Sequence, residues 1–159
     1  MARKMIRVLL VEDEEINRVV ARAALKAAGG GDVVDEAENG EVAVQRVRDA
    51  AAPYDLVLMD KQMPVMDGHE ATRRIRGMGV TTPIVAVSSD GLPADVDAFI
   101  TAGADDFTSK VRACAQRRDS HACNGMGMPS HILCPRRSWE SSLPNLDLLN
   151  DVYICVLLN

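Results

Sequence analysis

Three carboxylates, a hydroxyl and an amine in this sequence have types and positions that would allow them to do chemistry together. Glu12 and Asp13 end one apolar run, while Asp60, Ser88 and Lys110 each end another. Clustered carboxylates ionise together only with a cation among them, and oxygen ligands favour a hard ion such as Mg²⁺. Asp60 could then act as a nucleophile and form an acyl phosphate. Mg²⁺ and the Lys110 ammonium would balance the charge of the phosphoryl oxygens, and Ser88 would donate a hydrogen bond to one of them.

Each of these residues also has an ordinary structural explanation. An aspartate after a strand is commonly a helix cap or a turn residue, and Glu12 and Asp13 could cap the helix that follows. Ser88 could be a turn residue, and Lys110 a solvated charge. Each explanation is sufficient for one residue alone. A chance origin is much less expected for all of them together, because they stand at the ends of four strands in the order that the site needs.

Alternating strand and helix patterns would bring these residues together. Short apolar runs typical of buried strands occupy 6–11, 33–37, 56–59, 84–87 and 106–108. This alternation predicts an α/β fold, a doubly wound parallel five-stranded sheet with helices on both faces and functional groups at the carboxyl ends of its strands. The inward positions predicted for the four helices are, in order, Ile16, Val20, Ala23 and Ala27; Ala43, Val44 and Val47; Ala71, Ile75 and Met78; Val96, Phe99 and Ile100.

Composition and charge fit one globular domain. Apolar residues make up 47% and charged residues 26% of the 159 residues, and the net charge of −5 disfavours a dedicated nucleic-acid binder. The sequence has neither an apolar run long enough for a bilayer nor a signal-peptide pattern at its start. We therefore expect no membrane association, and a cytoplasmic or also nuclear location.

A boundary is predicted near Lys110, which separates a domain at 1–110 from an atypical tail at 111–159. All four cysteines lie in the tail, which we expect to be largely disordered to residue 143, with a helix or strand at 146–158. Free thiols are the default interpretation. A metal site is the alternative, but its spacing lacks the paired cysteines of structural zinc sites; its ligands would be Cys114, Cys123, His131 and Cys134.

Four stretches resemble the receiver domain of two-component response regulators, which has a flavodoxin-like fold. They are VLLVED at 8–13, LVLMDKQMPVMDG at 56–68, PIVAVS at 83–88 and GADDFTSK at 103–110. The resemblance covers about two-thirds of the chain. The first helix, with Glu14-Glu15-Ile16-Asn17-Arg18, is similar to receivers of hybrid histidine kinases and of the plant single-domain regulators called type C.

The resemblance implies a role for each site residue. Asp60 is the phosphoacceptor, Asp13 binds Mg²⁺ directly, Glu12 acts mostly through water, and the backbone carbonyl of Gln62 is a further ligand. Ser88 and Lys110 contact the phosphoryl group, and Phe107 occupies the position of the aromatic switch residue. The loop residues Met63, Pro64, Asp67 and Gly68 have a shaping role, while His69 is expected to be a solvated residue of the first helical turn.

The resemblance also implies a signalling switch rather than an enzyme: a monomeric, stand-alone receiver without a DNA-binding output domain. Its partner would be a histidine-phosphotransfer protein or a hybrid histidine kinase, contacted partly through Ile16 and Val20, in a setting such as cytokinin signalling. Alternatives are a phosphate sink that drains such a partner and a degenerate receiver. A phosphatase of the haloacid dehalogenase type is disfavoured, because Gln62 stands where that family needs a second carboxylate.

The sequence departs from the family pattern after Lys110. Val111 replaces the usual proline, so a trans Lys110–Val111 bond is expected. Residues 112–120 carry no apolar stripe, and glycine and proline interrupt the chain at 125–129. The fifth helix of the fold is therefore predicted to be atypical or missing.

Overall fold

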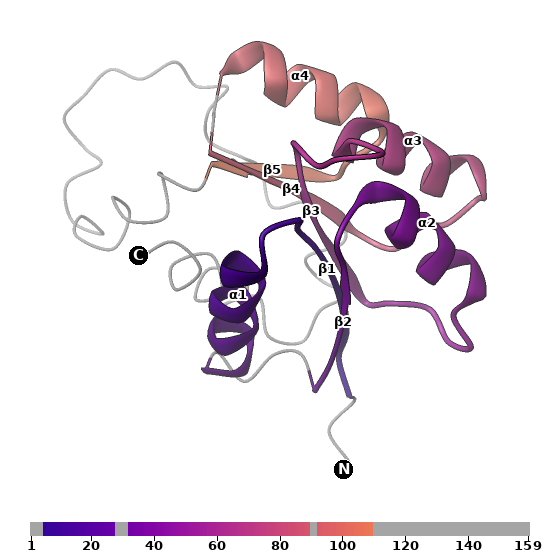
Figure 1. The fold of residues 1–159 in the computed structure, drawn as a ribbon. Coiled ribbons are helices and arrows are strands. Elements are labelled where there is room, and N and C mark those ends of the chain that lie inside the picture. The colour runs from indigo at the N-terminus through magenta and orange to yellow at the C-terminus, as the bar shows by residue number, and fades with distance from the viewer. Residues whose placement is uncertain (1–4, 28–31, 90–91, 110–159) are drawn as a thin grey trace, which may run out of the picture.

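The computed structural model describes residues 5–27, 32–89 and 92–109, which form one parallel sheet flanked by helices (Figure 1). The strands are β1 (Arg7–Val11), β2 (Val33–Ala37), β3 (Leu56–Asp60), β4 (Ile84–Ser88) and β5 (Asp106–Ser109). Their order in the sheet is β2-β1-β3-β4-β5, and every pair is parallel. The predicted doubly wound five-stranded sheet is confirmed, and β1 and β3 lie side by side near its centre.

Four helices connect these strands: α1 (Glu15–Ala27), α2 (Gly40–Asp49), α3 (Gly68–Gly77) and α4 (Pro93–Ala102). In Figure 1, α1 lies on one side of the sheet, and α2, α3 and α4 lie on the other. Two of the helices begin at side-chain caps, because Asn39 accepts a hydrogen bond from the Val42 N–H and Asp67 accepts one from the Glu70 N–H. Gly103 ends α4 in the left-handed conformation, with φ 105°.

Successive residues of a strand point to opposite faces of the sheet, so they pack into two separate hydrophobic cores. Leu9, Val57 and Met59 belong to the larger core, which also contains Ile75 of α3 and Phe99 of α4. The neighbouring strand residues belong to the core that contains Ala21 and Leu25 of α1; they are Val8, Leu10, Leu56 and Leu58. The sheet is thus covered from both sides.

The inward stripe predicted for α1 is wrong at Ile16 and Ala23, while Val20 is half-buried. Ile16 is 65% exposed and Ala23 is exposed, whereas the helix buries Ala21, Ala24 and Leu25. Both sets have helical spacing, so periodicity could not distinguish between them. The small alanines of the buried set allow α1 to pack closely against the sheet.

Two further inward residues were predicted wrongly. Met78 is exposed because it is the capping residue after the last turn of α3. Ile100 is partly exposed because its neighbour Phe99 takes the inward position on α4. The inward positions predicted for α2 are confirmed: Ala43, Val44 and Val47 pack into the larger core.

Several predictions fall outside the described residues. These concern Lys110, the Lys110–Val111 bond, the fifth helix and the whole tail with its cysteines and the 146–158 segment. Among the helices of the described ranges, none is both long and apolar enough to cross a membrane.

Candidate functional site

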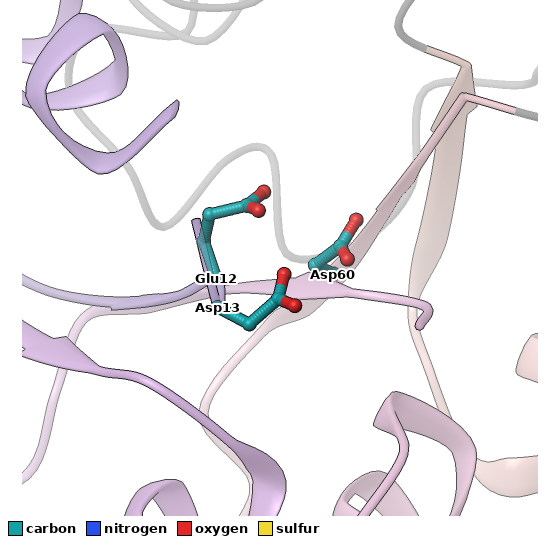
Figure 2. A group of neighbouring side chains, drawn as sticks. All are labelled: Glu12, Asp13 and Asp60. Atoms are coloured by element: carbon teal, nitrogen blue, oxygen red, sulfur yellow. The ribbon is translucent and has the colours of Figure 1, made fainter. Parts of the chain in front are cut away.

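The three predicted carboxylates lie at the carboxyl ends of the two central strands. Val11 pairs with Met59 in the register of β1 and β3, so Glu12 and Asp60 follow side by side. Carboxylate oxygens of Glu12, Asp13 and Asp60 all lie within 4.8 Å of one another, and Figure 2 shows the three side chains around a common space. Glu12 and Asp60 are only 6% and 8% exposed, and Asp13 is more exposed than either.

This donor set fits a hard divalent cation. Three carboxylates so close together repel one another, and burial of two of them adds to the cost of keeping all three ionised. All three offer oxygen, which suits Mg²⁺, and the cleft beside them has room for the waters that this ion retains. Gln62 and Ser88 line the same cleft.

The first turn of α1 holds the Glu12–Asp13 segment in place. Arg18 donates hydrogen bonds from Nη1 to the carbonyl oxygens of Glu12 and Asp13, both at 2.8 Å. Asn17 Nδ2 donates to Glu12 Oε1 at 3.1 Å, and the Glu12 N–H donates to the Ala37 carbonyl at 3.0 Å. Sequence reasoning assigned Asn17 and Arg18 no separate role, although their place directly after the acidic pair was a usable signal.

The loop after Asp60 returns tightly to its own start. The Gly68 N–H donates to the Lys61 carbonyl at 3.0 Å, and a Cβ at position 68 would come within 2.1 Å of the Asp60 carbonyl oxygen. Only glycine fits there without a backbone shift. Between them, Val65 is exposed and adopts the left-handed conformation, with φ 69°.

The remaining predicted site residues are placed as follows. Ser88 ends β4 beside the carboxylates and is buried, and Gln62 is exposed on the rim of the cleft. Phe107 is half-buried, with its ring centroid 6.0 Å from that of Phe99. The structure therefore brings Gln62 and Ser88 to the acidic cluster, whereas Lys110 lies outside the described residues.

His69 differs from its prediction as a solvated residue. Its side chain is 17% exposed, and its ring stacks on Phe99 with the centroids 3.9 Å apart. Within the described ranges, its buried Nε2 has no hydrogen-bond partner. Burial lowers the pKa of His69 below its ordinary value, against the opposing effect of the Asp67 carboxylate. The His69 ring covers the apolar face of Phe99. The position of His69 in the first turn of α3 gave no indication of this contact in the sequence.

An ion pair beside the site was also missed. Lys61 Nζ lies 2.7 Å from Asp95 Oδ1 in the first turn of α4. The two residues are far apart in sequence, and no periodic pattern connects them.

Comparison with known families defines the class of protein. Residues 8–117 match the response regulator receiver domain. The chain belongs to this family, which confirms the resemblance carried by the sequence motifs.

Individual relatives are similar to this chain over the same region. It is 43% identical over 103 residues to two-component system protein A of Emericella nidulans, a match that covers 65% of this chain and 15% of that protein. It is 45% identical over 87 residues to two-component response regulator ARR22 of Arabidopsis thaliana, with 55% of this chain and 60% of that protein covered. Two-component response regulator 24 of the same plant is 35% identical, with 69% and 77% covered. The chain thus spans less than two thirds of the length of the first two relatives.

Solved receiver structures share the fold. The receiver domain of sensor histidine kinase PA1611 from Pseudomonas aeruginosa is 36% identical, with a TM-score of 0.60 and 72% of this chain and 93% of that one covered. The receiver domain of histidine kinase CKI1 from Arabidopsis thaliana is 37% identical, with a TM-score of 0.56 and 65% and 82% covered. The PA1611 receiver has a magnesium ion coordinated in its active-site cleft, and the CKI1 receiver is complexed with Mg²⁺.

Proposed function

We propose that this chain is a phosphorelay receiver that accepts a phosphoryl group on Asp60 in a Mg²⁺-dependent reaction. The observation that carries the proposal is the approach of Glu12, Asp13 and Asp60 to within 4.8 Å at adjacent strand ends, in a member of the receiver family. Asp60 is the member of this cluster that ends β3 and begins the tightly closed loop.

The residues present fit a magnesium ion. Asp13 and Asp60 would hold it through carboxylate oxygens, Gln62 through its backbone carbonyl, and Glu12 mostly through water. The bound ion would supply positive charge to the phosphoryl oxygens. Asn17 and Arg18 would keep the Glu12–Asp13 segment in position for this purpose, because their hydrogen bonds hold both its backbone and the Glu12 carboxylate.

In the proposed reaction, a carboxylate oxygen of Asp60 attacks the phosphorus atom of a phosphohistidine. The new oxygen–phosphorus bond forms as the nitrogen–phosphorus bond breaks, and the imidazole of the donor leaves with the electron pair of that bond. Ser88 would donate a hydrogen bond to one phosphoryl oxygen, and Lys110 would contact another. Phe107, packed near Phe99, would report the change as the switch residue.

The donor that we propose is a histidine-phosphotransfer protein or a hybrid histidine kinase, with the receiver acting as a monomer. Relatives of this chain include proteins named as histidine kinases, among them CKI1 of Arabidopsis thaliana. A donor imidazole must approach Asp60 through the cleft, and Asn17 of α1 forms part of the cleft wall. Ile16, which is 65% exposed on the same turn, is a suitable apolar contact for that donor.

The test is phosphorylation by acetyl phosphate in the presence of Mg²⁺, followed by intact-mass measurement. Wild-type protein should acquire one acid-stable, base-labile adduct, and peptide mapping should place it on Asp60. Asp60→Asn should acquire none while its circular dichroism stays unchanged, because the amide preserves the shape of the side chain but cannot form an acyl phosphate. Asp97→Asn, an exposed change on α4, is the matched control and should be labelled normally. An adduct that persists in Asp60→Asn would refute the assignment.

A further inference from the structure

The ion pair between Lys61 and Asp95 joins the phosphoacceptor segment to α4. Lys61 directly follows Asp60, and its Nζ lies 2.7 Å from Asp95 Oδ1. The two side chains are only 16% and 21% exposed, so water screens their attraction less than it screens a typical surface pair.

Lys61 also borders the cleft in which phosphorylation would occur. It lines the same space as Asp60 and Ser88. Its backbone is fixed, since its carbonyl accepts the hydrogen bond from Gly68. Its side chain ends in a point charge on a flexible four-carbon stem, which can exchange one anionic partner for another without a backbone movement.

The charge at Asp60 changes in the proposed reaction. A carboxylate carries one negative charge, whereas the acyl phosphate that replaces it carries more negative charge and presents additional acceptor oxygens. An ammonium group one residue away is therefore attracted more strongly to the phosphorylated site than to the free one. Asp95 competes for the same ammonium group.

We propose that Lys61 is a second phosphoryl-binding cation of this receiver, and that Asp95 holds its ammonium group until the phosphoryl group arrives. The proposal rests on the proposed phosphorylation of Asp60. Transfer of Lys61 from Asp95 to the phosphoryl oxygens breaks the contact between the end of β3 and the first turn of α4. It thereby links the state of Asp60 to the helix that carries Phe99, against which His69 stacks and Phe107 packs.

The experiment is calorimetric titration of the full chain with beryllofluoride, a phosphoryl analogue, in saturating Mg²⁺. Lys61→Met should weaken beryllofluoride binding on the order of tenfold, because a charge-assisted contact to the analogue is lost. Lys61→Arg should retain most of the affinity. Asp95→Asn should bind the analogue a few-fold more tightly (about 2–5-fold), since Lys61 no longer has a competing anion. Asp97→Asn, on the same helix, should match the wild type.

A separate titration with Mg²⁺ alone distinguishes electrostatics from damage to the fold. Lys61→Met should bind Mg²⁺ as well as or better than the wild type, because a repelling charge has been removed, while it binds beryllofluoride less well. Opposite changes of this kind are not expected from a merely structural role. Lys61→Gln provides a second neutral variant if Lys61→Met does not fold.

Two results would overturn the proposal. If Asp95→Asn binds beryllofluoride no more tightly than Asp97→Asn, Asp95 does not restrain Lys61. If the neutral variants Lys61→Met and Lys61→Gln bind the analogue like the wild type, Lys61 does not contact it. In either case a wild-type protein that binds beryllofluoride leaves the proposed function intact. A wild-type protein that fails to bind it in Mg²⁺ would refute both proposals.

Discussion

The two ends of the sheet use the same kind of side chain in opposite ways. At the amino ends, an aspartate stands directly before each of β2, β3 and β5, and each accepts a backbone N–H at the start of the neighbouring strand. The bonds run from Ile6 to Asp32 at 2.9 Å, from Arg7 to Asp55 at 2.9 Å and from Ile84 to Asp105 at 2.8 Å. At the carboxyl ends, Glu12, Asp13 and Asp60 instead gather within 4.8 Å.

Each end of the sheet also has an arginine that donates hydrogen bonds to it. Arg76 donates to Asp105 and to three backbone carbonyls around the amino ends of β4 and β5. Arg18, at the carboxyl ends, donates to the carbonyls of Glu12 and Asp13. Carboxylates bonded to N–H groups and arginine stabilise the fold, whereas a cluster of like charges lowers its stability until a cation binds. The comparison indicates that the amino ends of the sheet contribute stability, whereas the carboxyl ends carry the residues of the proposed phosphoryl transfer.

The largest effect on stability is expected from Arg76→Met at the amino ends. The change removes the ion pair with Asp105 and leaves the carbonyls of Val80, Thr82 and Gly103 without this donor. The free energy of unfolding should fall by about 2–4 kcal/mol, as measured by urea denaturation. The Mg²⁺ affinity of the folded protein should not change. If Arg76→Met weakened Mg²⁺ binding by a comparable free energy, the two ends of the sheet would not have separate roles.

Neutralising one aspartate at each end should produce stability changes of opposite sign. Asp13→Asn should raise the stability measured without Mg²⁺, because it relieves repulsion with Glu12 and Asp60. Asp55→Asn should lower it, because it weakens the charge-assisted bond from the Arg7 N–H. Mg²⁺ at ten times its dissociation constant should stabilise the wild type by about 1.4 kcal/mol. Asp13→Asn should lose most of that gain. Thermal unfolding with and without Mg²⁺ measures all four effects. Stability changes of the same sign for Asp13→Asn and Asp55→Asn would contradict the comparison.

A smaller effect is expected from Arg18→Met, which releases the backbone of the Glu12–Asp13 segment. Mg²⁺ affinity should fall by about 3–10-fold, which corresponds to the loss of one hydrogen-bonding side chain. Arg22→Met is the matched control: Arg22, one turn further along α1, also pairs with Glu36, whereas the bonds to the Glu12 and Asp13 carbonyls come from Arg18. Calorimetric titration with Mg²⁺ should separate the two variants, and equal affinities would show that the segment holds its position without Arg18.

The smallest effect concerns pH. In the unfolded chain, His69 takes up a proton near its ordinary pKa of 6.5. In the folded protein burial lowers the pKa of His69, so the proton binds only at lower pH. Stability should therefore fall as the pH is lowered through 6.5 and level off below the folded pKa. Asp67 and Asp95 oppose the shift, while Lys61 and Arg73 reinforce it. His69→Phe should retain the stacking on Phe99 and flatten this part of the profile. An unchanged profile would exclude His69 as its source.

Much of the fold and of the acidic cluster could be predicted from the sequence, because strand ends in a parallel sheet occupy one edge. The alternation of apolar runs placed Glu12, Asp13, Asp60 and Ser88 correctly at that edge. The burial of His69 and the Lys61–Asp95 pair could not be predicted, because both depend on how α3 and α4 approach one another and the loop. The aspartates before β2, β3 and β5 carried a usable signal that was not exploited, namely one acidic residue directly preceding each strand.

The close approach of Gly68 to the Asp60 carbonyl has a consequence for evolution and for engineering. Residues 61–68 form a ring of fixed length, closed by the bond between the Gly68 N–H and the Lys61 carbonyl, and Gly68 packs against the peptide group of Asp60. An insertion or deletion within the ring would displace Asp60, the proposed phosphoacceptor, as well as the loop. If the proposed reaction depends on this position of Asp60, relatives that carry it out should conserve the length of this segment as strictly as its residues. Grafts of partner-specific loops onto this scaffold should exchange side chains within the ring and leave its number of residues unchanged.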